Sequence, residues 1–142
     1  MAIERLAGAW RLKVFEFTDA KGGLFHPLGE RPHGSLVVTG DGYAVISFSA
    51  SDRPKFATDD IFAATAEERA AAAAGYVSFG GPCEVTDNSI AIRVEHSSFP
   101  NWVGGKQVRL YEVAGDKLTL RTPGARVFGG TERSGRAELE KA

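Results

Sequence analysis

The stretch QVRLYEVAGDKLTLRT, residues 107–122, alternates apolar and polar side chains on either side of a Gly-Asp turn. This period of two is typical of half-buried strands, and the turn joins the two strands into a hairpin. Directly opposed residues of a hairpin point to the same face, so a loop with an even number of residues pairs Tyr111 with Leu120. Because Leu120 alternates with charged residues, its face is the buried one. The pattern therefore predicts that Arg109, two residues before Tyr111, points inward.

An inward Arg109 needs a partner, because an unpaired charge in a low-dielectric site costs several kcal/mol. Three interpretations stay open: a ligand anion, an internal acid such as Glu84 or Glu95, or a loop of odd length that turns Arg109 to solvent. A solid sandwich core tolerates an inward arginine poorly, whereas a barrel with a water-filled cavity accommodates it. The pattern therefore favours a barrel.

The same alternation recurs along most of the chain. WRLKVFEF (10–17) places Trp10, Leu12 and Val14 on one face of an opening strand, and RAELEK (136–141) reads as the closing strand. Two further hairpins turn at residues 41–42 and 87–88. We expect an all-β fold of about 8–10 strands.

Even loops in these two hairpins predict which residues share the inner face. The second hairpin then pairs Val85 with Ile90 and Cys83 with Ile92. The first pairs Val38 with Val45 and Leu36 with Ser47. The apolar interior then carries the polar or weakly polar residues Tyr43, Ser47, Cys83, His96, Gln107, Arg109 and Tyr111.

One segment departs from the strand pattern. TAEERAAAAAGY (65–76) has a capping box at Thr65 and Glu68, a run of alanines, and Gly75 at a C-cap position. We expect one short inserted helix, with residues 56–75 forming a partly helical cap over one end of the sheet.

Composition limits the function classes. The 142 residues fit one domain, 1–142, and 17 basic against 18 acidic residues give a net charge of -1. This balance gives no support for nucleic-acid or membrane partners. The single cysteine excludes an intramolecular disulfide and, with no signal-like N-terminus, predicts a cytoplasmic protein. We expect a small-molecule partner and leave a homodimer open.

Four segments together resemble the lipocalin-like domain family of small bacterial and fungal proteins. They are LAGAWRLKVFEF, PHGSLVVTGDGYAVI, TAEERAAAAAGYVSFGGPCEV and FPNWVGGKQVRLYEVAGDKLTLRTP. The resemblance implies a closed antiparallel barrel with a cavity for a small, largely apolar molecule, but it supplies no reaction. The chain departs from the family where Cys83 replaces a frequent tyrosine and Ile92 lies near a frequent histidine. Leu139 and Lys141 likewise stand where tryptophan and arginine are common.

The leading functional hypothesis is a lipocalin-like barrel that binds a largely apolar metabolite with an acidic or carbonyl head. The alternative is a cofactor-independent isomerase, cyclase or lyase acting on a hydrophobic carbonyl compound, with His96, Tyr111 and Arg109 as catalytic candidates. Scattered histidines and absent motifs predict no metal and no cofactor. The predicted ligand-binding residues are Arg109, Tyr111, Gln107, Tyr43, Ser47, His96, Cys83 and Trp102.

Overall fold

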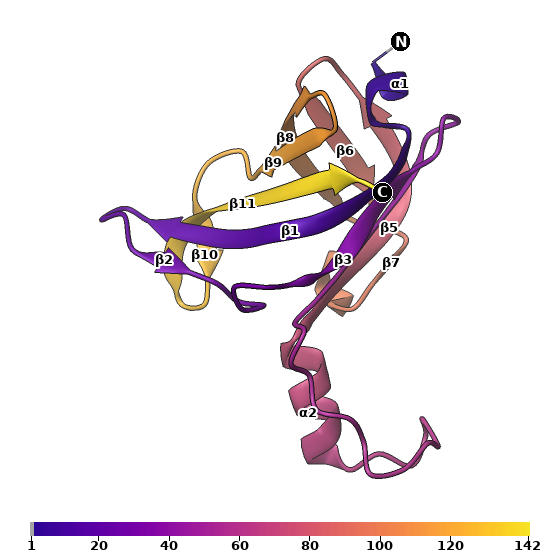
Figure 1. The fold of residues 1–142 in the computed structure, drawn as a ribbon, viewed down its shortest axis with the longest axis vertical. Coiled ribbons are helices and arrows are strands. Elements are labelled where there is room, and N and C mark those ends of the chain that lie inside the picture. Colours follow the sequence, from indigo (N-terminus) through magenta and orange to yellow (C-terminus); the bar gives the residue numbers. More distant parts are fainter. Residues whose placement is uncertain (1) are drawn as a thin grey trace.

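A computed structural model describes residues 2–142 and shows a closed antiparallel barrel (Figure 1). This confirms the predicted fold class and strand number. The barrel strands are β1 (Gly8–Asp19), β3 (His33–Val38), β4 (Tyr43–Ser49), β5 (Tyr76–Val85), β6 (Ser89–Arg93), β8 (Lys106–Ala114), β9 (Lys117–Arg121) and β11 (Thr131–Lys141). Short strands and helices complete the chain: α1 (Ile3–Leu6), β2 (Leu24–Phe25), α2 (Ala66–Ala74), β7 (His96–Ser97), η1 (Pro100–Trp102) and β10 (Arg126–Phe128).

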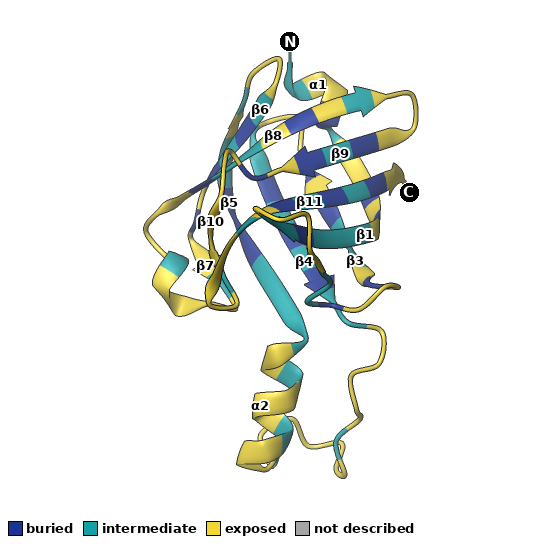
Figure 2. Cartoon of the chain, turned by 90° about the vertical axis from the view of Figure 1, so that its left-hand side faces the viewer, coloured by how far each residue is buried: buried dark blue, intermediate teal, exposed yellow. Residues whose placement is uncertain are grey.

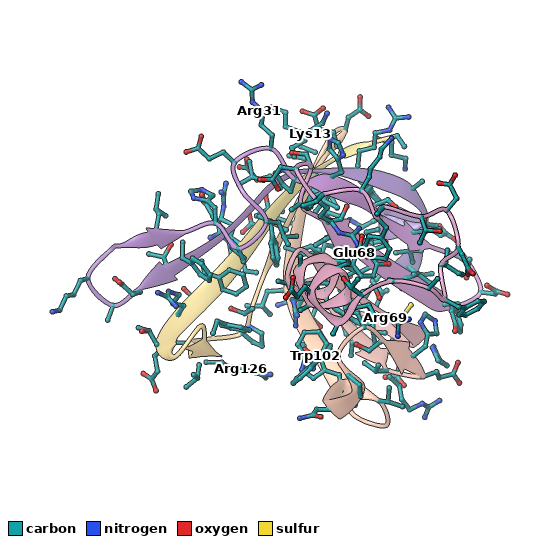
Figure 3. All side chains as sticks on the ribbon, turned by 90° about the horizontal axis from the view of Figure 1, so that it is seen from below. Lys13, Arg31, Glu68, Arg69, Trp102 and Arg126 are labelled. Carbon is teal, nitrogen blue, oxygen red and sulfur yellow. The ribbon has the colours of Figure 1, made fainter. Side chains whose placement is uncertain are left out.

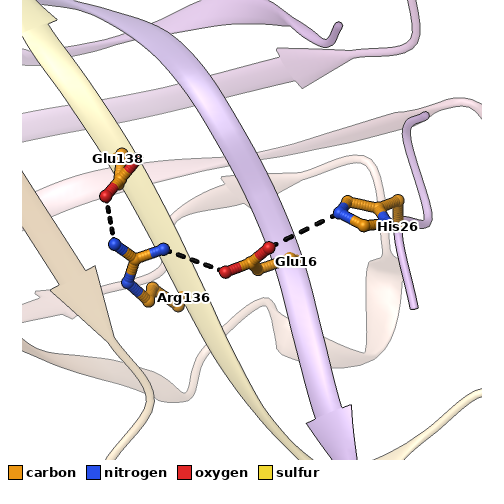
Figure 4. A network of polar contacts seen from close by, with 4 residues as sticks. All are labelled: Glu16, His26, Arg136 and Glu138. Atoms are coloured by element: carbon orange, nitrogen blue, oxygen red, sulfur yellow. Dashed lines mark hydrogen bonds and ion pairs between the residues drawn. The ribbon is translucent and has the colours of Figure 1, made fainter. Parts of the chain in front are cut away.

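The first and last long strands close the barrel. β1 and β11 pair from Trp10 opposite Lys141 to Asp19 opposite Arg133. On the outer face of this seam, Arg136 bonds to Glu16 at 2.9 Å and also to Glu138, while His26 lies 3.4 Å from Glu16 (Figure 4).

One half of the barrel interior is solidly packed. Trp10 is 1% exposed, and its indole Nε1 donates to the carbonyl of Leu6 at 2.9 Å. Leu6 belongs to α1 and is fully buried, so α1 packs into this end. The Lys141 ammonium lies 4.8 Å from the Trp10 ring centroid, a cation–π contact. Lys141 thus covers the tryptophan from the closing strand.

A β-bulge corrects the predicted face of the opening strand. Leu12 pairs with Leu139 and Val14 with Glu138, so Lys13 is an extra residue in β1. A bulge shifts the alternation of all later side chains by one position. Val14, predicted inside with Trp10, therefore faces outward.

The register of the first hairpin was also predicted wrongly. Val38 pairs with Ala44, not Val45, and Leu36 pairs with Ile46, not Ser47. Thr39 N donates to the Tyr43 carbonyl and Gly42 N to the Thr39 carbonyl, with Gly42 at φ 97°. This is a loop of odd length, a type I turn closed by a glycine bulge. The second and third hairpins have the predicted pairings.

The inserted helix α2 begins at the predicted capping box, with mutual hydrogen bonds between Thr65 and Glu68, and ends at Gly75. It follows β4 and precedes β5, and it projects away from the barrel (Figures 1 and 2). None of its residues is buried, and Phe62 in the preceding loop is 83% exposed. The helix thus extends outward from the ends of β4 and β5, and the structure does not show residues 56–75 packed as a cap over the cavity. No helix within residues 2–142 is long and apolar enough to span a membrane.

A close backbone crossing requires a glycine in β5. A Cβ on Gly81 would lie 1.9 Å from the Arg93 carbonyl oxygen.

We expect Gly81→Ala to lower the free energy of unfolding by about 1–3 kcal/mol, the usual cost of overpacking. Gly40→Ala is the control, because no atom lies within 4 Å of a Cβ there. Urea denaturation of both variants measures the difference, and equal midpoints would contradict this crossing.

We also expect the arm of residues 51–74 to exchange its amide hydrogens faster than β4 and β6. The arm buries no helical side chain, and segments with few packed contacts open at low free-energy cost. Hydrogen exchange read by mass spectrometry tests this. Protection of α2 equal to that of β4 would show that the arm packs rigidly against the barrel in solution.

Candidate functional site

The other half of the barrel interior contains a cavity of about 300 Å³. This volume lies at the lower end of the range typical of small-molecule sites. Seven aromatic residues line it: Phe15, Phe17, Phe25, Phe48, Phe79, Phe128 and Trp102. Ile46, Val77, Leu120 and Ala137 add aliphatic surface.

Several aromatic rings of the cavity wall contact one another edge to face. Phe15 meets Phe17 with centroids 5.2 Å apart and Phe48 at 5.4 Å, both edge to face. Phe15 and Phe17 point inward because the bulge at Lys13 shifts the alternation of β1. Edge-to-face packing fixes the ring orientations, so this wall is preformed for a flat apolar molecule.

Trp102 lies at the edge of the cavity, on the short helix η1. Its ring is 5.5 Å from Phe79 and 5.3 Å from the exposed Phe99. Seen from the α2 end, Trp102 and Arg126 lie on the same side of the molecule (Figure 3). Trp102 is one of the predicted ligand-binding residues, and it lies in the cavity wall.

Arg109 points into the cavity from β8, at the position opposite Ile90. Its Nη1 donates to the Val108 carbonyl at 2.8 Å and to Gln107 Oε1 at 3.3 Å. The guanidinium carbon lies 5.6 Å from the Phe79 centroid. No carboxylate within residues 2–142 forms an ion pair with it.

The two acids considered as partners of Arg109 lie elsewhere. Glu84 and Glu95 are both exposed, and Glu95 accepts a hydrogen bond from the Tyr43 hydroxyl at 3.2 Å. Burial, and to a smaller extent the charge of Arg126, together lower the pKa of Arg109 to about 10. Arg109 is thus a desolvated cation whose charge the described protein does not neutralise.

The remaining polar groups near Arg109 are already bonded. The Thr122 hydroxyl donates to the Gly124 carbonyl at 3.0 Å and accepts from Gly135 N at 2.8 Å. Gln107 is 8% exposed and accepts from Arg109. The guanidinium is therefore the main unsatisfied polar group facing the cavity.

Two predicted site residues point inward but lie in the packed half. Tyr111 is 4% exposed, and its hydroxyl donates to the Thr86 carbonyl at 2.5 Å. Cys83 packs against the core, and burial raises the pKa of its thiol. Neither residue lines the cavity.

Three predicted site residues lie on the outer face. Tyr43 and Ser47 face outward because the first hairpin has an odd loop, and Ser47 bonds to the Tyr76 hydroxyl at 3.0 Å. Burial and the hydrogen bond to Glu95 raise the pKa of Tyr43. His96 is exposed and lies against Gly80. The structure thus separates these side chains from Arg109.

Sequence reasoning missed most of the aromatic wall. A signal existed for Phe15 and Phe17, which alternate with polar Glu16 in VFEF. The alternation of Trp10 and Leu12, however, assigned the inner face to the even-numbered residues of this strand. Phe25 and Phe128 come from strands of two and three residues, too short for a readable period. Among residues 2–142 no group of three or more His, Cys, Asp or Glu side chains is placed to hold a metal ion.

A closed antiparallel barrel with a largely apolar cavity, which Arg109 enters, has the architecture of small-molecule-binding barrels. The chain belongs to the lipocalin-like domain family, whose model matches residues 7–139. It is also similar to the 4'-hydroxy-3'-methoxypropiophenone carrier protein ppsC of Aspergillus oryzae (strain ATCC 42149 / RIB 40). The two are 34% identical over an alignment of 88 residues that covers 56% of this chain and 79% of that protein.

We expect Arg109→Met to raise the free energy of unfolding by about 1–4 kcal/mol, the range for replacing buried charges by apolar side chains. The folded pKa lies below the ordinary value, so the charged form destabilises the fold at every pH below about 10. Between that pH and the ordinary pKa of an arginine side chain, the unfolded chain holds more protons and stability rises with pH.

Thermal unfolding at neutral pH measures this effect. Arg11→Met is the control, because Arg11 is exposed and its replacement should change stability by no more than about 0.5 kcal/mol. A lower midpoint for Arg109→Met than for Arg11→Met would mean that the bonds to Gln107 and Val108 outweigh the desolvation of the guanidinium.

Proposed function

We propose that the protein binds a small, largely apolar and aromatic metabolite inside its barrel, with an acidic or carbonyl head group at Arg109. The single observation that carries this proposal is that Arg109, which no carboxylate among the described residues neutralises, points into a largely apolar cavity with seven aromatic rings. The rings provide apolar surface, and Arg109 provides the hydrogen-bond donors that orient the head group.

The related carrier supports an aromatic ligand. The name of that carrier specifies a phenolic aryl ketone, a flat molecule with an apolar ring and oxygen acceptors at both ends. The ring of such a molecule can pack against the aromatic side chains of the cavity, and its oxygen atoms can accept hydrogen bonds from the Arg109 guanidinium. We take this ketone as a probe rather than as the identified ligand.

A cavity-filling variant tests the binding site. Val77 lines the cavity, so Val77→Trp should fill it and weaken binding of the ketone at least tenfold. Val37→Trp is the matched control, because Val37 is 42% exposed on the outside of the barrel. Isothermal titration calorimetry measures both variants and the unmodified protein.

The expected result is binding by the unmodified protein and by Val37→Trp, with loss in Val77→Trp. Equal affinity of all three would place the ligand outside the cavity. If neither the ketone nor the apolar fluorophore 8-anilinonaphthalene-1-sulfonate binds the unmodified protein, the proposal fails. Cytoplasmic location, a single domain over residues 1–142 and a homodimer stay predictions.

A further inference from the structure

We infer that the barrel binds its ligand as an anion, through two neighbouring oxygen atoms held by the free edge of the Arg109 guanidinium. This inference rests on the proposed function, because it specifies the head group of the same ligand. It distinguishes an ionised weak acid from a neutral ketone, both of which an acidic or carbonyl head would allow.

The hydrogen bonds of Arg109 leave one edge of the guanidinium free. Both bonds to protein, to the Val108 carbonyl and to Gln107 Oε1, use Nη1. Within residues 2–142, Nε and Nη2 have no hydrogen-bond or ion-pair partner. The N–H bonds of these two atoms run parallel on the same edge, which is the geometry that binds two oxygen atoms side by side.

The charges around Arg109 favour an anion over a neutral acceptor. No aspartate or glutamate of residues 2–142 lines the cavity, and the charge that lowers the pKa of Arg109 is that of a second cation, the exposed Arg126. A neutral ketone would accept hydrogen bonds but leave the positive charge of Arg109 uncompensated. An anion compensates this charge in a desolvated site, where charge interactions are stronger than in water.

The cavity wall defines the rest of the ligand. The guanidinium carbon lies 5.6 Å from the Phe79 ring centroid, so a head group on the free edge lies directly beside aromatic surface. This favours a conjugated weak acid whose negative charge is shared by two oxygens or has a second oxygen next to it. Aromatic carboxylates, enolates of 1,3-dicarbonyl compounds and phenolates with an ortho oxygen share this chemistry.

The ionisation of a bound phenol tests the inference directly. Phenol and phenolate absorb at different wavelengths, so a pH titration of the bound phenolic ketone reports its pKa in the site. We expect this pKa to fall by at least one unit on binding, which means that the phenolate binds at least tenfold tighter than the phenol. A para-acyl group already lowers the phenol pKa below the value of about 10 of tyrosine, so Arg109 stays charged through the titration.

Two ligand controls separate charge from shape. The 3',4'-dimethoxy ketone cannot ionise and should bind with an affinity independent of pH. The 4'-hydroxy ketone without the methoxy group offers one oxygen and should show a smaller pKa shift. An equal shift would overturn the two-oxygen contact.

The protein variants identify Arg109 as the cause. In Arg109→Met the bound phenol should lose the downward shift, and its pKa should rise above the free value because burial disfavours the phenolate. Arg11→Met, on the outer face, should keep the shift. If the unmodified protein binds the ketone without lowering its pKa, the anion inference fails while the proposed function stands. If the protein binds neither any of these ketones nor 8-anilinonaphthalene-1-sulfonate, the proposed function itself fails.

Discussion

The pairing of β1 with β11 is the constraint on which the rest of the structure depends. It turns a row of hairpins into a barrel, and only a closed barrel removes the inner side chains of every strand from water at once. The seam relies on backbone pairing along its whole length. The ion pairs of Arg136 and Glu16 outside it are partly exposed, and such pairs contribute little stability. The same closure desolvates Arg109, so the chemistry of the cavity follows from the topology.

Two irregular features limited prediction of the fold from sequence. Alternation identified the barrel and two of three hairpin registers, because their loops contain an even number of residues. The Asp41-Gly42 pair fits either a two-residue turn or the observed three-residue loop with its glycine bulge, so the signal alone could not choose. The bulge at Lys13 also leaves no signal in the sequence, because apolar residues occur on both sides of Lys13. Each feature reverses the parity of every residue that follows in its strand.

Predictions from the hairpins reached the candidate site only where the register was right, and Trp102 was predicted from its loop position. Arg109 and Gln107 follow from the third hairpin, and they meet in the structure at 3.3 Å. Tyr43 and Ser47 were assigned to the site from the first hairpin, and the odd loop places them on the outside. The aromatic wall combines residues from β1, β2, β4, β5, η1 and β10, and no local pattern brings such separate segments together. Long-range closure therefore decided the composition of the site.

The titratable groups around the cavity bear on whether the protein could bind a ligand or also catalyse a reaction on it. An arginine stabilises an enolate or a phenolate, but a proton transfer also needs a base within hydrogen-bond reach of the reacting atom. Of the catalytic candidates, His96 is exposed on the outer face, and the hydroxyl of Tyr111 is bound to the Thr86 carbonyl in the packed half. The described cavity wall contains no aspartate, glutamate or histidine. Arg109 can therefore hold an anion, and among the described residues no carboxylate or imidazole in the cavity wall stands beside it to transfer a proton, which supports the proposed binding role.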